Sequence, residues 1–175
     1  MNKDQDTIYA INHYNFFDKI VFKKRLEISN IINNIIEDLQ IHDALDIGTT
    51  SDDKNASSNI VIKNIKNIDK FKCISDQIVN SDFFNKKLKK SITEEFSENE
   101  LNDFSSDLVV SNATIEHVGN TLNQKKMLEN VIKLTKKIFV ITTPNKFYPI
   151  ELHTKIPLIH WFPKSIYRKI LKFLG

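Results

Sequence analysis

Hydrophobic positions recur along this chain with two periods, one typical of helices and one typical of buried strands. From residue 14 to residue 39, apolar residues follow the helical period and form a wide stripe that we expect to pack on a sheet. Three phenylalanines near its start, Phe16, Phe17 and Phe22, either join this core or form a lid over a ligand, and their spacing favours the core.

Short apolar runs bounded by turn residues predict buried strands. The expected strands are 43–47, 71–75, one around Ile92, one around Val109 and Val110, and 137–142. The expected helices between them are 59–68, 78–88 and 123–134, while the acidic stretch 97–106 suits a surface loop. Strands that alternate with helices predict βαβ units, and therefore an α/β fold with a mostly parallel sheet and helices on both faces.

The first strand ends in a polar loop that begins D-I-G-T-T-S-D-D at Asp46. In an open α/β sheet, ligands bind outside the carboxyl ends of the strands, which is where Asp46 and Gly48 lie. Asp76 follows the second strand and is placed to accept hydrogen bonds from ribose hydroxyls, although dinucleotide folds put this acid only roughly 20 residues after the glycines. An aspartate here is equally well explained as the cap of a following helix.

Composition narrows the classes of function. The chain has 175 residues, of which 41% are hydrophobic and 27% charged, and this suits one soluble globular domain. We divide it into an N-terminal helical segment (1–40), a cofactor-binding core (41–145) and an acceptor-side segment with a tail (146–175). A net charge of +3 is too small to indicate a nucleic-acid partner.

The cysteine and histidine content points to a cytoplasmic protein without a dedicated metal site. The single cysteine, Cys73, cannot form an internal disulfide. The N-terminus shows no basic region followed by an apolar core, and no apolar run approaches the ~18 residues of a membrane-spanning helix. The five histidines include no H-x-x-x-H pair, and G-x-x-x-x-G-K-[ST] and G-x-S-x-G motifs are absent.

Three segments taken together carry a resemblance to a known family. They read D-A-L-D-I-G-T-T-S-D, F-S-S-D-L-V-V-S-N-A-T-I-E-H-V-G-N and V-I-T-T-P-N-K-F-Y-P-I-E-L-H-T-K-I-P-L-I-H-W-F-P, and they span most of residues 43–162. This ordered set resembles the class I S-adenosylmethionine-dependent methyltransferases, and more narrowly a bacterial branch whose first motif is D-x-G-T-T. The resemblance implies a Rossmann-like methyltransferase fold.

The resemblance also implies a cofactor, S-adenosyl-L-methionine, and a set of residues that bind it. These residues follow the first, second and fourth strands: Asp46, Gly48, Thr49, Asp76, Ser111, Asn112, Ala113 and Glu116. The family places a further acidic residue after the third strand, against the adenine. Glu94 is the nearest candidate for that role, although its match is not clear.

Methyl transfer from a sulfonium needs little from side chains beyond positioning, because the methyl group is already electrophilic. An acceptor hydroxyl or protonated amine also needs a general base. We take His117 and His153 as candidates for that base, because neutral imidazole titrates near physiological pH. A purely structural role is the simpler interpretation of each histidine alone, and His160, between Ile159 and Trp161, is typical of a packed side chain.

The C-terminal part departs from the family pattern. Related chains continue after the fifth strand with an antiparallel hairpin, and this chain shows no equivalent. Either the protein is a shortened variant, the reading frame is truncated, or the chain is a fragment. In each case we expect a shortened sheet with an exposed edge at the fifth strand unless the tail covers it. That edge offers a surface for self-association. Residues 161–174 read as a basic amphipathic segment, which suits either peripheral contact with a membrane or, as we favour, an ordinary helix without its packing partner.

The sequence therefore predicts a methyltransferase that acts on a small molecule, a sugar or a lipid precursor. The first alternative is a non-catalytic methyltransferase-like module that binds a partner through the truncated sheet. The second is a nicotinamide-dependent oxidoreductase, which requires a G-x-G-x-x-G turn that D-I-G-T-T-S-D lacks.

Overall fold

A computed structural model describes residues 16–52 and 58–144 of the chain. Its helices are α1 (Phe16–Glu37), α2 (Ile60–Lys63), α3 (Glu98–Phe104) and α4 (Thr121–Leu134). Its strands are β1 (Asp43–Ile47), β2 (Lys70–Ser75), β3 (Lys86–Lys89), β4 (Ser106–Asn112) and β5 (Thr135–Thr142). None of these helices is long and apolar enough to cross a membrane.

The five strands form one sheet in the order β3-β2-β1-β4-β5, and every neighbouring pair is parallel. The chain first runs outward from β1 to β3 and then returns to β4 on the other side of β1. This reversal of direction is the topological switch of a Rossmann-like, doubly wound sheet. The expected α/β class with a parallel sheet is therefore confirmed.

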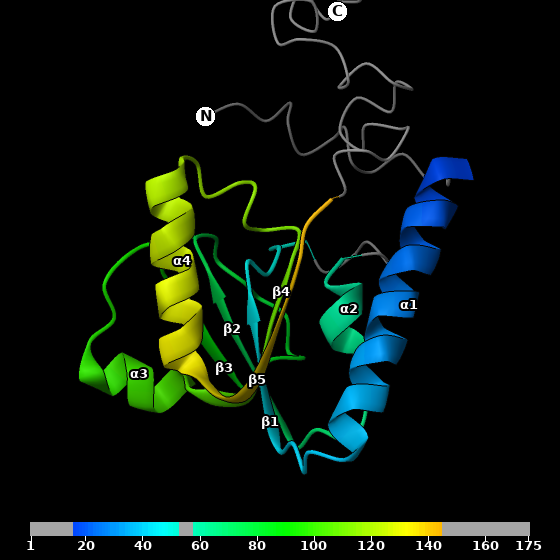
Figure 1. Cartoon of the computed structure of the whole chain (residues 1–175), viewed down its shortest axis with the longest axis horizontal. Coiled ribbons are helices and arrows are strands. Elements are labelled where there is room, and N and C mark those ends of the chain that lie inside the picture. Colours follow the sequence, from blue (N-terminus) through cyan, green and yellow to red (C-terminus); the bar gives the residue numbers. More distant parts are fainter. Residues whose placement is uncertain (1–15, 53–57, 145–175) are drawn as a thin grey trace, which may run out of the picture.

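Helices cover both faces of the sheet, as Figure 1 shows with α1 and α2 on one side and α3 and α4 on the other. On the first face, the core is formed by Ile32, Ile36, Val61 and Ile62 packed against strand residues such as Ala44 and Leu108. On the second face, the helical members are Phe104, Met127, Val131 and Leu134, and the strand members include Leu45 and Val109. The central strands are buried on both faces, which explains their continuous apolar runs.

The region between β2 and β4 differs most from the sequence prediction. The helix expected over 78–88 is absent, and the third strand lies at Lys86–Lys89 rather than around Ile92. Asn85 explains part of this, because its backbone N–H and its side-chain Oδ1 both hydrogen-bond to the backbone of Phe71. The chain is thereby tied to the start of β2 and extends alongside that strand.

The acidic stretch predicted as a surface loop contains α3. Ser97 and Glu100 form a reciprocal capping box, in which each side chain accepts a hydrogen bond from the backbone N–H of the other. This motif satisfies two N–H groups that a helix start leaves unpaired. By contrast, the helix predicted over 59–68 is shortened to the four residues of α2.

The N-terminal helix is confirmed, but its apolar stripe is only partly buried. Ile32 and Ile36 lie in the core, whereas Ile31, Ile35 and Leu39 are exposed. The side chains of Phe16 and Phe17 lie outside the described part of the structure, so the lid alternative stays a prediction for them. His153, His160 and the C-terminal tail also lie outside the described residues.

Candidate functional site at the carboxyl edge of the sheet

The residues predicted to bind a cofactor gather at the carboxyl edge of the sheet. β1 and β4 are neighbours, so the loops that follow Ile47 and Asn112 leave the sheet side by side at the switch point. Asp76 follows the end of β2, next to β1. A parallel sheet places these loops on one edge although the sequence separates them widely, and this edge is where doubly wound folds bind ligands.

Asp46 is buried at the end of β1 and is held by its own loop. Its Oδ2 accepts a hydrogen bond of 2.6 Å from Thr49 Oγ1, and Thr49 is itself 2% exposed. Burial disfavours the charged carboxylate and raises the pKa of Asp46 to about 6, although the bond from Thr49 acts in the opposite direction. Both side chains therefore face inward and shape the loop.

The raised pKa makes the stability of the protein depend on pH. Between its ordinary pKa of 3.8 and its folded pKa of about 6, Asp46 binds more protons in the folded state than in the unfolded state. The free energy of unfolding must then fall as pH rises through this window, by about 3 kcal/mol for this group. Asp46→Asn should abolish that contribution, so urea denaturation between pH 4 and pH 7 should show a flatter profile for the variant. Parallel profiles would contradict the prediction.

The loop after β1 is fixed by side chains from distant positions. Thr50 donates its backbone N–H to Asn59 Oδ1, and Asn59 Nδ2 donates to the Thr50 carbonyl. Ser51 donates from its backbone and its hydroxyl to Gln77 Oε1. Ser75 Oγ donates to the Thr49 carbonyl at 2.7 Å. The ends of β1 and β2 are therefore tied together, and residues 49–51 are held in place by protein contacts alone.

Gly48 is required by both backbone conformation and packing. Its φ is +83°, in a region that residues with a side chain rarely adopt. A Cβ at this position would lie 2.2 Å from Thr114 Oγ1. Thr114 also donates a hydrogen bond to the Ile47 carbonyl, so it joins the loop after β4 to the end of β1.

The end of β4 is fixed in a similar way. Ser111 is buried and donates to the Ile47 carbonyl, while Asn112 Oδ1 accepts from Thr142 Oγ1 at the end of β5. Ala113 adopts a φ of +55° and donates its backbone N–H to the Thr142 carbonyl. These contacts hold the three residues against the ends of β1 and β5.

Glu116 follows these residues in the chain and carries an unsatisfied acceptor. Its Oε2 accepts a hydrogen bond of 3.3 Å from Thr143 Oγ1, whereas its Oε1 is buried without a hydrogen-bond partner among the described residues. The Nε2 of exposed His117 lies 4.0 Å from Glu116 Oε1, and the two form an ion pair only when the histidine is protonated. A buried carboxylate oxygen without a donor is costly, so it suits a ligand that brings one.

Asp76 and Glu94 present exposed carboxylates beyond β2 and β3. Glu94 accepts a hydrogen bond from the Ser91 backbone N–H through Oε1, and its carbonyl accepts from Asn130 of α4. Glu94 is therefore committed in part to a local turn. Asp76 remains the exposed carboxylate directly at the end of β2, where the ribose-binding acid was predicted.

Sequence reasoning missed the residues that hold the loops. Thr114, Asn59 and Gln77 each join two segments of the site through hydrogen bonds. No rule of sequence spacing identifies an isolated asparagine or glutamine whose side chain hydrogen-bonds to a distant loop. Thr114 lies within one of the family-like segments, which was the only available signal.

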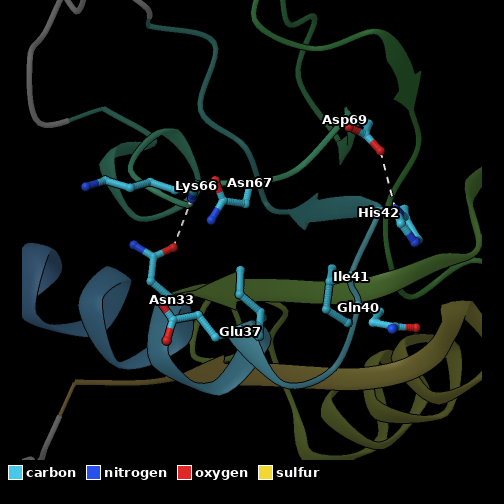
Figure 2. A pocket seen from close by; sticks show the side chains of 9 residues that line it. Asn33, Glu37, Gln40, Ile41, His42, Lys66, Asn67 and Asp69 are labelled. Carbon is cyan, nitrogen blue, oxygen red and sulfur yellow. Dashed lines mark hydrogen bonds and ion pairs between the residues drawn. The ribbon is translucent and has the colours of Figure 1, made fainter.

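A cavity lies at the opposite end of the strands, beside their amino ends (Figure 2). It measures about 630 Å³ and opens between α1 and the loop that precedes β2. Figure 2 shows the hydrogen bond between Asn33 and the backbone of Lys66, and the pairing of His42 with Asp69. The side chains of His42 and Asp69 lie 3.4 Å apart and are mostly exposed. Because this groove lies at the amino ends of the strands and is lined largely by solvated side chains, we place the functional site at the carboxyl edge. A smaller cavity of about 130 Å³ lies there beside Gln77 and Ile78.

No protein-family model matches this chain, and a search of curated proteins finds no match either. Within 16–52 and 58–144, no three His, Cys, Asp or Glu side chains lie together as a metal site would require. The function is therefore inferred from the sheet topology and the carboxyl-edge residues.

Proposed function

We propose that this chain is an S-adenosylmethionine-dependent methyltransferase that acts on a small molecule, a sugar or a lipid precursor. The observation that carries the proposal is the arrangement of the carboxyl edge. There the D-I-G-T-T loop, the exposed carboxylate of Asp76 and the segment 111–114 at the end of β4 flank one switch point. The fold alone would equally suit other nucleotide-like ligands.

The residues at this edge have the chemistry that such a cofactor requires. Asp76 is an exposed acceptor for two vicinal ribose hydroxyls, and the buried Oε1 of Glu116 is an acceptor without a donor. Gly48 lets Thr114 pack against the end of β1, so that the two loops meet at the switch point. The internally bonded side chains of Asp46, Thr49 and Ser111 keep the two loops in place.

When bound, the cofactor supplies an electrophilic methyl group, so the protein contributes chiefly orientation. The scaffold of hydrogen bonds from Thr114, Ser75 and Asn59 makes this edge pre-ordered. His117 is exposed at its rim and is the described candidate that takes a proton from an acceptor. His153, the second candidate from the sequence, lies outside the described residues.

The direct test is calorimetric titration of the purified chain with S-adenosylhomocysteine and, in parallel, with NAD. Binding of S-adenosylhomocysteine alone supports the proposal. Binding of NAD alone would favour an oxidoreductase, and binding of neither by folded protein would contradict a nucleotide-like cofactor. Cofactor binding without methyl transfer to any of a panel of hydroxyl and amine acceptors would favour a non-catalytic binding module.

Asp76→Ala should weaken S-adenosylhomocysteine binding at least about tenfold, because two hydrogen bonds to a charged acceptor are lost. The matched control is Asp82→Ala, which removes an exposed aspartate from the same β2–β3 connection but away from the end of β2. Both affinities are measured by titration calorimetry. Equal affinities for the two variants would show that Asp76 does not contact the cofactor.

A further inference from the structure

The two outer strands of the sheet, β3 and β5, differ in their charge. The outer strand β3 and the residue after it read Lys-Lys-Leu-Lys-Lys, from Lys86 to Lys90. Lysines on an edge strand prevent pairing with another strand. The centre of β5, by contrast, reads Ile-Phe-Val-Ile over residues 138–141, and no described strand pairs with its outer side. Only β5 therefore has the composition of an edge that another strand can cover.

Exposed apolar residues of α4 lie on the same side as this edge. Asn130 donates to the carbonyls of Ile92 and Glu94, so its flank of the helix points toward the β3 side of the sheet. Leu128 and Ile132 lie on the flank of α4 that is opposite to Asn130. They therefore point toward the β5 side of the sheet. Phe139 of β5 is itself 44% exposed.

A second apolar stripe borders β5 on the other face of the sheet. Ile31 and Ile35 lie on the exposed side of α1, and Leu39 follows four residues later in the turn after the helix. Asn33, which bonds to Asn64 after α2, marks the flank that faces the β3 side. Lys137 of β5 donates to the Leu39 carbonyl at 3.2 Å, so the turn that follows α1 lies beside β5. In Figure 1, α1 and α4 flank β5 on its two sides.

We propose that the β5 edge and its two apolar stripes form the interface of a symmetric homodimer. A twofold axis perpendicular to the sheet would pair β5 antiparallel with β5 of a second copy. That symmetry brings each apolar stripe against its own equivalent, as an isologous interface requires. It joins the two sheets into one continuous sheet and covers Phe139.

Charge favours a second copy at this edge and opposes one at the other. Antiparallel pairing centred on residues 138–141 sets Lys136 and Lys137 opposite Thr143 and Thr142 of the second copy. The lysines of the two chains then lie at opposite ends of the paired segment. The same pairing centred on Leu88 of β3 would set lysine opposite lysine at every flanking position, which is destabilising.

The test is the mass of the full-length chain in solution, measured by light scattering after size-exclusion chromatography over a range of micromolar concentrations. The wild type should have twice the mass of the 20.4 kDa chain. Ile132→Glu should be monomeric, and Ile78→Glu should remain dimeric. The control is matched because both isoleucines are 61% exposed, but Ile78 lies at the carboxyl edge. Circular dichroism verifies folding, and Phe139→Lys serves as the second variant if Ile132→Glu does not fold.

Two results would overturn the proposal. One is a monomeric wild type, and hydrogen exchange of the β5 amides would then show whether residues 145–175 of the same chain protect the edge. The other is a dimer that survives both Ile132→Glu and Phe139→Lys, which would place the interface elsewhere. Neither result bears on cofactor binding, so this inference and the proposed function fail independently.

Discussion

Replacing Asp43 with alanine should lower the free energy of unfolding by about 3 to 5 kcal/mol, because it leaves a largely buried lysine without its counter-ion. Asp43 Oδ2 lies 2.7 Å from Lys72 Nζ, and the two side chains are only 14% and 12% exposed. The other oxygen, Oδ1, accepts the backbone N–H of Asp107 at 2.8 Å. The change therefore disrupts contacts that join β1 to β2 and to β4.

Urea denaturation at pH 7 measures this loss. The matched control is Glu27→Ala, which removes a salt bridge of similar length, 2.6 Å to Lys24, from the exposed surface of α1. Exposed pairs contribute at most about 1 kcal/mol, so the control should remain near the wild type. Equal losses in the two variants would contradict the assignment of Asp43 to a buried network.

The same network should weaken in acid. Burial raises the pKa of Asp43. Hydrogen bonds from Lys72 and from the Asp107 backbone, together with the charges of Lys72 and Lys136, lower the pKa by more than burial raises it, so the net shift is downward. A carboxyl whose folded pKa is depressed contributes stability above its ordinary pKa of 3.8 and loses it as pH falls through the folded value. This slope has the opposite sign to that of Asp46, whose contribution falls between pH 3.8 and about 6.

Gly48→Ala should destabilise the protein by roughly 3 kcal/mol, through overpacking against Thr114 and a positive φ that alanine disfavours. The new Cβ would lie 2.2 Å from Oγ1, 2.5 Å from Cγ2 and 2.9 Å from Cβ of Thr114. Under the proposed function, displacement of Thr114 also distorts the cofactor loop, so S-adenosylhomocysteine affinity should fall as well. Thermal denaturation and titration calorimetry measure the two effects.

Two further variants separate the loss of stability caused by the clash with Thr114 from the loss caused by the positive φ. Gly119→Ala has a similar backbone demand, with a φ of +101°, but its Cβ would meet only Asn123 Nδ2, at 3.3 Å. It should therefore cost about 1 kcal/mol. In Gly48→Ala combined with Thr114→Ala, two of the three close contacts disappear, and part of the stability should return. If the double variant were no more stable than Gly48→Ala, the clash would not be the cause.

The fold could be predicted where a segment's pattern agrees with its surroundings. β1 and β4 are buried on both faces, so their apolar runs are continuous and recognisable. β3 could not be recognised in this way, because its four residues Lys86–Lys89 include three lysines and only one of the described strands pairs with it. α3 was missed for a related reason, since it buries little apart from Phe104 and begins through a local capping box.

The site was predictable as a set of strand ends but not as a set of contacts. That Asp46, Asp76 and Ser111 would share one edge follows from a parallel sheet, because parallel strands end on the same side. Which of them faces a ligand does not follow. Asp46 and Ser111 turned inward to hydrogen-bond with Thr49 and Ile47, whereas Asp76 stays exposed.

The sequence by itself determined the α/β class, the parallel strands around Leu45 and Val109 and the position of the glycine loop. These features follow from the spacing of apolar residues and from turn residues, which decide the local structure of the segment that contains them. Only the tertiary structure decided that Thr114 packs over Gly48, that Lys72 neutralises Asp43, and that Ile31 and Ile132 remain exposed on two sides of β5. Each of these depends on contacts between residues far apart in the chain. Such contacts are set by how the strands are ordered in the sheet, and a local pattern does not encode that order.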